Sequence, residues 1–392
     1  MKKISLIILI IGVVFSSCQN GDWEFPDNDF SAVYFAYQTP VRTITLGKDY
    51  VNDNTIDNEH KCQIMATVAG FREIKKDIEI SFKVDNTLCD GLDNVTAMPS
   101  NYYSLSDNKI IIKKGSKMMG GVVVTLTDAF FADTLALKKY SKGKVVNPKD
   151  QENYYVIPLV ITDVKNADKI LDGKEYILYA VKYLNPYDVI YLRRGTDMIT
   201  EDGVTRTEKR QGNYSPEEDE VIKLNSISSK EIEFSVNDHR VNDINLKMTF
   251  KLDFDPITQK CTFANGAWKN PGLFKTLFDG DDKEIIPTWN WKNFQLVKEY
   301  VEEYYFDIKN KKSYEYRVYD IVVTGSGEYR TDGEKQSWGS KDRDALYLNY
   351  KVEYKVEVPI GSAPKTMKYE TEDILVFRDR GVALETFSPK WK

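Results

Sequence analysis

The chain has 392 residues, of which 42% are hydrophobic and 29% are charged, and its formal net charge is −6. This composition excludes an intrinsically disordered chain, and the length allows two domains of about 150 to 200 residues, each with its own core. The negative charge disfavours nucleic acid and anionic lipid headgroups as partners, because both carry charge of the same sign.

Residues 1–17 have the pattern of a secretory signal peptide. Lys2 and Lys3 make a basic start, an apolar run covers residues 4–15, and two serines precede Cys18. The apolar run is shorter than the roughly 20 residues that span a bilayer, so we do not expect a transmembrane helix. A cysteine after small residues is where bacterial lipoproteins carry their lipid. We therefore expect lipidation of Cys18, with an ordinary secreted protein as the alternative.

Residues 18–30 are polar and acidic and contain Pro26, which is typical of a tether between a membrane and a first domain. With Cys18 lipidated, the lipid rather than protein charge would hold the chain to the membrane. Two or more acyl chains hold firmly, whereas one binds reversibly.

Residues 31–184 contain short strand signals separated by Gly, Asn, Asp or Pro, and none has a 3.6-residue period over three turns. Apolar and polar residues alternate in 77–85, as in a half-buried antiparallel strand. Pro158 places its strand at a sheet edge or marks a bulge there. About seven or eight such strands predict an immunoglobulin-like sandwich. The strand signals cover 31–38, 42–47, 62–70, 77–85, 109–115, 121–128, 154–164 and 175–184.

The turn at residues 185–188 (NPYD) marks the expected domain boundary, because Asn-Pro favours turn initiation. Residues 189–392 repeat the strand signal with longer strands. In 350–358 every second residue is apolar or aromatic, and charged residues stand between them. This pattern predicts a second β domain, either a lipocalin-like β-barrel or a second sandwich. The expected fold class is all-β.

Several spaced cues in residues 30–185 resemble the immunoglobulin-like N-terminal domain of Bacteroidetes outer-membrane lipoproteins from polysaccharide-utilisation systems. The end of the chain, residues 374–389, resembles the end of the uncharacterised β-rich C-terminal domains in the same lipoproteins. The resemblance implies an outer-membrane, cell-surface location and a glycan context. The cues are VYF at 33–35, His60, PSNYYSL at 99–105, the hairpin between 109–115 and 121–128, and YVIPLVIT at 155–162.

Three cysteines remain once Cys18 is assigned to the lipid, and three cannot all pair. Cys62 and Cys261 stand in strand-like segments and are expected to be small core residues. A bridge between Cys62 and Cys89 stays open as an alternative. The two histidines are far apart and lack ligand spacing, so we expect no zinc site.

No catalytic motif is evident in the sequence. Asp253 and Asp255 resemble the acidic signature of chitinase-type glycosidases, but Ile257 stands where that signature has its general acid. The nucleophile elbow, the phosphate loop and the dinucleotide fingerprint are missing. The acidic turn at 278–284 lacks the spacing of an EF-hand. We therefore expect no metal and no cofactor, and a binding protein is favoured over an enzyme.

Two aromatic clusters are candidate sugar-binding sites. Trp289 and Trp291 project the same way from an extended chain, and Trp268 lies in the preceding stretch. Flat rings stack on the apolar faces of pyranoses, while neighbouring polar groups bond the hydroxyls. The alternative is that these tryptophans are core residues.

The second cluster surrounds Trp338, which stands in a segment between two long strands. Arg330, Asp332 and Asp342 stand near it in the sequence and could grip sugar hydroxyls.

The sequence thus predicts a non-catalytic surface lipoprotein that binds a polysaccharide or oligosaccharide. Two alternatives remain open. One is a glycoside hydrolase or esterase whose carboxylates are scattered in the sequence. The other is a structural subunit that docks to an outer-membrane transporter complex.

Overall fold

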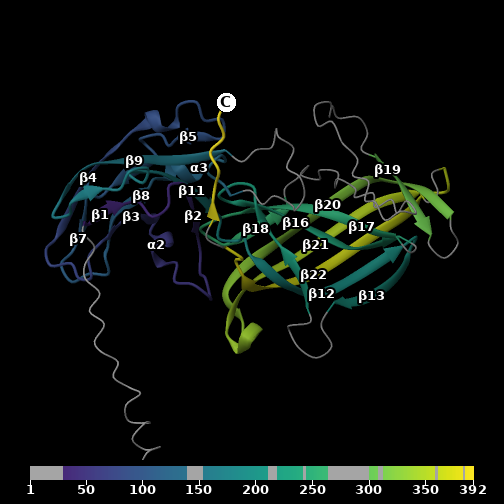
Figure 1. The fold of residues 1–392 in the computed structure, drawn as a ribbon. Helices are drawn as coiled ribbons and strands as arrows, with labels where there is room; N and C mark the ends of the chain where they lie inside the picture. Colours follow the sequence, from purple (N-terminus) through teal and green to yellow (C-terminus); the bar gives the residue numbers. More distant parts are fainter. Residues whose placement is uncertain are drawn as a thin grey trace, which may run out of the picture.

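A computed structural model shows two β-rich domains side by side (Figure 1). The predicted all-β class is confirmed, since the described helical segments are short: α2 (Thr55–Asn58), α3 (Asp128–Ala132), and the 3-10 turns η1 (Asn86–Cys89) and η5 (Trp338–Ser340). No described helix is long and apolar enough to cross a membrane. The structure describes residues 30–138, 153–210, 219–241, 244–263, 300–307, 312–357, 361–382 and 385–392.

The first domain packs two sheets face to face. The described strands of one sheet run in the order β10-β1-β3-β8-β6, and those of the other run β23-β2-β11-β9-β4-β7, with β5 beside β9. The first sheet contains β1 (Ala32–Tyr34), β3 (Lys61–Ala69), β6 (Tyr103–Leu105), β8 (Met119–Leu126) and β10 (Lys169–Ile170). The second contains β2 (Pro40–Thr45), β4 (Ile78–Val84), β5 (Val95–Ala97), β7 (Lys109–Ile112), β9 (Tyr154–Lys165), β11 (Tyr176–Leu184) and β23 (Glu385–Thr386).

Alternating residues of both sheets form the core of this domain. Cys62 and Ile64 on β3 face Ile80 and Phe82 on β4, and all four are buried. Cys62 and Cys89 are free, so no bridge joins them. Burial raises the pKa of the Cys62 thiol to about 12. Cys62 is therefore an inert core residue, as the sequence predicted.

Pro158 does not lie on an edge strand, which corrects the sequence-based expectation. β9 pairs with β11 on one side and with β4 on the other, and its bulge falls at Ile161 to Asp163. The Pro158 carbonyl accepts a bond from the Asp85 amide, just past the end of β4. The missing N–H of Pro158 thus faces the point where β4 ends, so no ladder bond is lost there.

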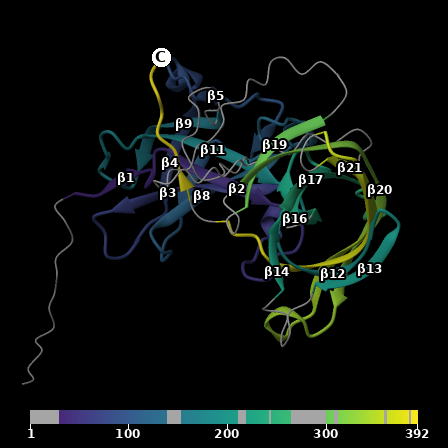
Figure 2. The same ribbon diagram turned by 90° about the vertical axis from the view of Figure 1, so that its right-hand side faces the viewer.

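The second domain is one curled sheet whose described strands follow the order β13-β12-β22-β21-β20-β18-β17-β16-β15. β14 pairs with β12 and β15 pairs with β16, so residues 220–226 contact both and the sheet curls round (Figure 2). Its strands are β12 (Ile190–Glu201), β13 (Val204–Arg210), β14 (Glu220–Lys223), β15 (Asn225–Ser226), β16 (Glu231–Val241), β17 (Ile244–Phe254), β18 (Lys260–Phe263), β19 (Tyr300–Asp307), β20 (Lys312–Glu334), β21 (Arg343–Glu357) and β22 (Lys365–Asp379).

The inside of the curled sheet holds apolar side chains and a network of charges. The predicted alternation is confirmed for residues 350–357, because Tyr350, Val352 and Tyr354 are buried in the core, and Val358 lies outside the described residues. Arg193 is fully buried and donates from Nε and Nη2 to Asp373 Oδ2, at 3.0 and 2.9 Å. A buried charge is costly unless it is paired and hydrogen-bonded, and this arrangement meets both conditions.

The last residues of the chain return to the first domain. β23 pairs with β2, and Phe387, which is 6% exposed, stacks on Tyr154 with ring centroids 4.7 Å apart. Residues 385–392, which the sequence analysis grouped with the second domain, therefore pack on the first. The two domains are joined both by residues 185–189 and by this returning segment.

The packing of Phe387 predicts that Phe387→Ala destabilises the first domain. Removing a buried phenylalanine side chain typically costs about 3–5 kcal/mol. Urea unfolding of the whole chain should show an earlier first transition. The adjacent exposed residue offers a control, since Ser388→Ala should change stability by no more than about 0.5 kcal/mol. Equal unfolding midpoints for both variants would contradict the packing described.

Candidate functional site

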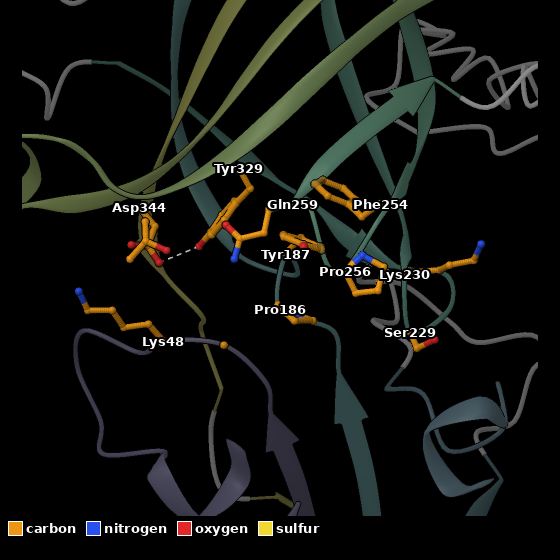
Figure 3. A pocket seen from close by; sticks show the side chains of 12 residues that line it. Lys48, Pro186, Tyr187, Ser229, Lys230, Phe254, Pro256, Gln259, Tyr329 and Asp344 are labelled. Atoms are coloured by element: carbon orange, nitrogen blue, oxygen red, sulfur yellow. Dashed lines mark hydrogen bonds between the residues drawn. The ribbon is translucent and has the colours of Figure 1, made fainter. Parts of the chain in front are cut away.

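A pocket of about 260 Å³ lies where the two domains meet (Figure 3). Gly47 and Lys48 of the first domain form one wall, and the linker residues Pro186 and Tyr187 form a second. The remaining walls come from the second domain: the ends of β17, β20 and β21, the turn before β16 and the turn between β17 and β18. The pocket therefore exists only when the domains are assembled.

Three aromatic rings form the base of the pocket, which we call the aromatic floor: Tyr187, Phe254 and Tyr329. Tyr187 stacks on Phe254 with centroids 3.7 Å apart and an interplanar angle of 15°. Tyr329 meets Tyr187 edge-on at 5.1 Å. The three residues are 2–7% exposed, so the floor is fixed by packing rather than mobile.

Exposed polar residues border the floor, and we call them the polar rim: Lys48, Ser229, Lys230, Gln259 and Thr331. Lys48 Nζ lies 2.8 Å from Asp332, and Lys230 Nζ lies 3.3 Å from Asp253. The bond from Lys48 holds the pKa of Asp332 below its usual value. The rim thus presents ammonium, amide and hydroxyl groups around an apolar base.

A buried carboxylate, Asp344, joins the two domains beside the pocket. Its side chain accepts bonds from the hydroxyls of Tyr50 in the first domain, at 2.7 Å, and Tyr329 in the second, at 2.9 Å. Burial, and then the bond to Asp344, raises the pKa of Tyr50 well above its usual value. Burial likewise raises the pKa of Tyr329. Both phenols therefore remain protonated donors at neutral pH.

Arg380 holds the loop wall in place. This residue is 2% exposed, and its Nη2 donates to the carbonyls of Lys48 at 2.9 Å and Pro186 at 3.3 Å. Gly47 has a φ of +79°, and a Cβ there would lie 2.9 Å from Arg380 Nη2. Only glycine suits both the conformation and the close contact.

The tryptophans of the first predicted cluster, Trp268, Trp289 and Trp291, lie outside the described residues. Trp338 lies in η5 and is partly buried, with the guanidinium of Arg378 5.4 Å from its ring centroid. The Trp338 ring thus already makes a cation–π contact within the protein, with Arg378.

The polar residues predicted around Trp338 are engaged by different partners. Arg330 pairs with Glu328 at 2.6 Å and covers the ring of Tyr347. Asp342 accepts bonds from Lys335 and from the backbone of Gln336. Asp332 bonds Lys48 and Tyr50. Of the three, Asp332 is the one placed beside the pocket.

The aromatic floor was missed by the sequence analysis, although one signal was available. In β17 the alternation of buried residues places Phe250, Leu252 and Phe254 on one face, toward the core. Asp255 accepts bonds from the Ile257 amide at 2.9 Å and the Thr258 hydroxyl at 2.8 Å. It therefore supports a turn, and the aromatic residue before it faces the pocket.

Family models match both parts of the chain. Residues 26–168 match a family model described as an N-terminal domain, and 186–270 and 303–381 match Domain of unknown function (DUF5627). A Bacteroides ovatus protein of unknown function is 30% identical, with 93% of this chain and 100% of that chain covered and a TM-score of 0.66. An auxiliary nutrient-binding protein from Bacteroides thetaiotaomicron is 12% identical, with coverage of 86% and 90% and a TM-score of 0.32. No curated protein matches the chain.

The bonds at Asp344 predict that Tyr50→Phe weakens the junction between the domains. The ring contact with Phe377 stays, but a buried carboxylate loses a donor, which typically costs about 1–3 kcal/mol. Chemical unfolding measures this loss. Tyr37→Phe is the matched control, because Tyr37 is 56% exposed. Identical stabilities for the two variants would show that the Tyr50 hydroxyl has no such role.

Proposed function

We propose that this protein, which belongs to the same family as the Bacteroides ovatus protein of unknown function, is a non-catalytic glycan-binding protein. The observation that carries the proposal is the pocket between the domains, with its aromatic floor and polar rim. A sugar ring has apolar C–H faces and hydroxyls at its edge. A rigid apolar base with polar groups around it complements both.

The volume of the pocket limits the size of the ligand it can hold. Pockets for drug-sized ligands have about 300–1,000 Å³, and this one has about 260 Å³. It suits one sugar ring or the end of a chain. The exposed Lys48, Lys230 and Thr331 of the rim can donate to ring and hydroxyl oxygens, and Gln259 can both donate and accept.

The chemistry of the pocket favours binding over hydrolysis. Glycosidases use two carboxyl groups about 5 to 9.5 Å apart on either side of the scissile bond. Of the described residues that line the pocket, Asp344 is the only carboxylate, and it is 2% exposed and bonded to Tyr50 and Tyr329. It acts as a structural acceptor. The described residues also include no group of His, Cys, Asp and Glu that could hold a metal ion.

The location we propose is the outer membrane, with a lipid on Cys18 and the protein at the cell surface as part of a polysaccharide-utilisation system. The proposal is supported by the basic start, the short apolar run and the small residues before Cys18. It is also supported by the resemblance of residues 30–185 to outer-membrane lipoproteins of such systems.

The polar rim predicts that Lys230→Ala and Thr331→Ala weaken glycan binding. Each loses about one hydrogen bond, near 1 kcal/mol, so the affinity should fall about fivefold for each. Affinity electrophoresis against soluble plant and host polysaccharides identifies the ligand, and calorimetry with its oligosaccharides measures the affinity.

A lysine on the first domain provides the control, since Lys114→Ala removes an exposed charge away from the pocket and should bind as the wild type does. No retardation of the wild type by any polysaccharide would overturn glycan binding. Release of reducing sugar by the purified protein would favour the glycosidase alternative.

The proposed anchor predicts that Cys18→Ala moves the protein from the membrane fraction to the soluble fraction of cells. The variant has no sulfur to carry the lipid, so burial of acyl chains can no longer hold it. Fractionation measures the distribution, and mass spectrometry of the N-terminal peptide detects the lipid. A wild-type protein that is soluble and unlipidated would contradict the anchor.

A further inference from the structure

Trp391 stands out among the described tryptophans because it is 78% exposed, whereas Trp338 is partly buried. It pairs with Leu92 of the first domain. The end of the chain lies near β5 (Figures 1 and 2). Trp391 is not among the residues that line the pocket between the domains. An exposed indole near a chain end is usually mobile, so the way its backbone is held decides whether it can form a site.

The backbone of Trp391 is fixed on both sides. Trp391 forms an antiparallel bridge with Leu92. The Asp93 amide donates to the Lys390 carbonyl at 2.7 Å, and the Lys392 amide donates to the Gly91 carbonyl at 2.9 Å. A backbone held in this way does not have to be ordered when the ring binds a ligand, which favours affinity.

The side chain of Asn94 adds a second clamp on the same segment. Asn94 is 7% exposed, its Nδ2 donates to the Ser388 carbonyl at 3.1 Å, and its Oδ1 accepts from the Lys390 amide at 2.9 Å. The buried Phe387 and these two hydrogen bonds together hold residues 387–390, which precede Trp391, against the first domain.

Gly91 lies against the indole of Trp391. Its φ is +76°, and a Cβ there would lie 3.4 Å from Cε3 and Cζ3 of Trp391. The six-membered ring of the indole therefore lies against a residue with no side chain, in a conformation that favours glycine. The rest of the ring system is open to solvent.

The stretch of chain that pairs with the Trp391 segment is flanked by acidic residues. Asp90 and Asp93 stand on either side of the Gly91–Leu92 stretch that pairs with the Trp391 segment, and both are exposed. Ionised carboxylates are strong acceptors for hydroxyl groups. A protein partner would instead need an apolar patch of several hundred Å², and a single exposed indole does not supply it.

We propose that Trp391 is a second glycan contact, a stacking platform for the apolar face of a pyranose ring on the first domain. This inference rests on the proposed function and adds a site to it. The pocket takes one ring or chain end, and the platform takes a ring of the same or another chain. Trp391 was not among the candidate residues of the sequence analysis.

The test compares three variants with the wild type, using the polysaccharide that retards the wild type most strongly in affinity gels. Trp391→Ala should weaken binding about tenfold, as expected for loss of an aromatic anchor. Trp391→Phe keeps a smaller flat ring and should give an intermediate loss. Val204→Ala is the control, because Val204 is 74% exposed on the second domain and not in the pocket.

Fluorescence separates stacking from an indirect effect. The emission that disappears in Trp391→Ala belongs to Trp391, and this component should change when the polysaccharide binds. Equal melting temperatures for the variants would show that the fold is intact. Wild-type affinity for Trp391→Ala, with wild-type binding present, overturns the platform and leaves the pocket standing. Absence of binding by the wild type overturns both proposals.

Discussion

The buried carboxylate of Asp344 is the interaction on which the junction of the two domains depends. It accepts bonds from Tyr50 of the first domain and Tyr329 of the second. A buried carboxyl group is tolerated only while its hydrogen-bond partners remain, so separating the domains would leave it without them. Arg380 also lies at this junction. Its guanidinium donates hydrogen bonds to the backbone carbonyls of Lys48 and Pro186. The hydrogen bonds of Asp344 and Arg380 therefore hold the walls of the pocket together.

The same constraint operates inside the curled sheet. Arg193 on β12 and Asp373 on β22 are both fully buried and bonded to each other. Gly195 makes room for this pair, because a Cβ there would lie 2.7 Å from Asp373 Oδ1. Side chains alternate between the two faces of a strand, so a one-residue slip of β12 would move Arg193 outside and leave Asp373 without it. The charge pair thus favours one register between the strands, which in turn sets where the strand ends meet the first domain.

The return of residues 385–392 couples the domains a second time. Phe387 covers a small apolar cluster on the outer face of the second sheet, with Val41, Val95 and Val156. Without this cover, the cluster would be exposed to water at a cost of about 25 cal/mol per Å². The segment that closes this surface also carries Trp391 to the first domain. The return of residues 385–392 therefore both covers the apolar cluster and positions Trp391 for the proposed platform.

The sequence by itself determined the all-β class, the inward faces of strands such as 350–357, the core position of Cys62, and the absence of known catalytic motifs. These follow from a two-residue period and from residue chemistry, both of which are local. The tertiary structure alone decided that Pro158 stands in a central strand, that Asp332 meets Lys48, 284 positions away, and that Tyr187, Phe254 and Tyr329 share one floor. Periodicity indicates which face of a strand is buried. Which strands pair with one another depends on how the whole chain packs its apolar surface. A site built from strand ends depends on that pairing.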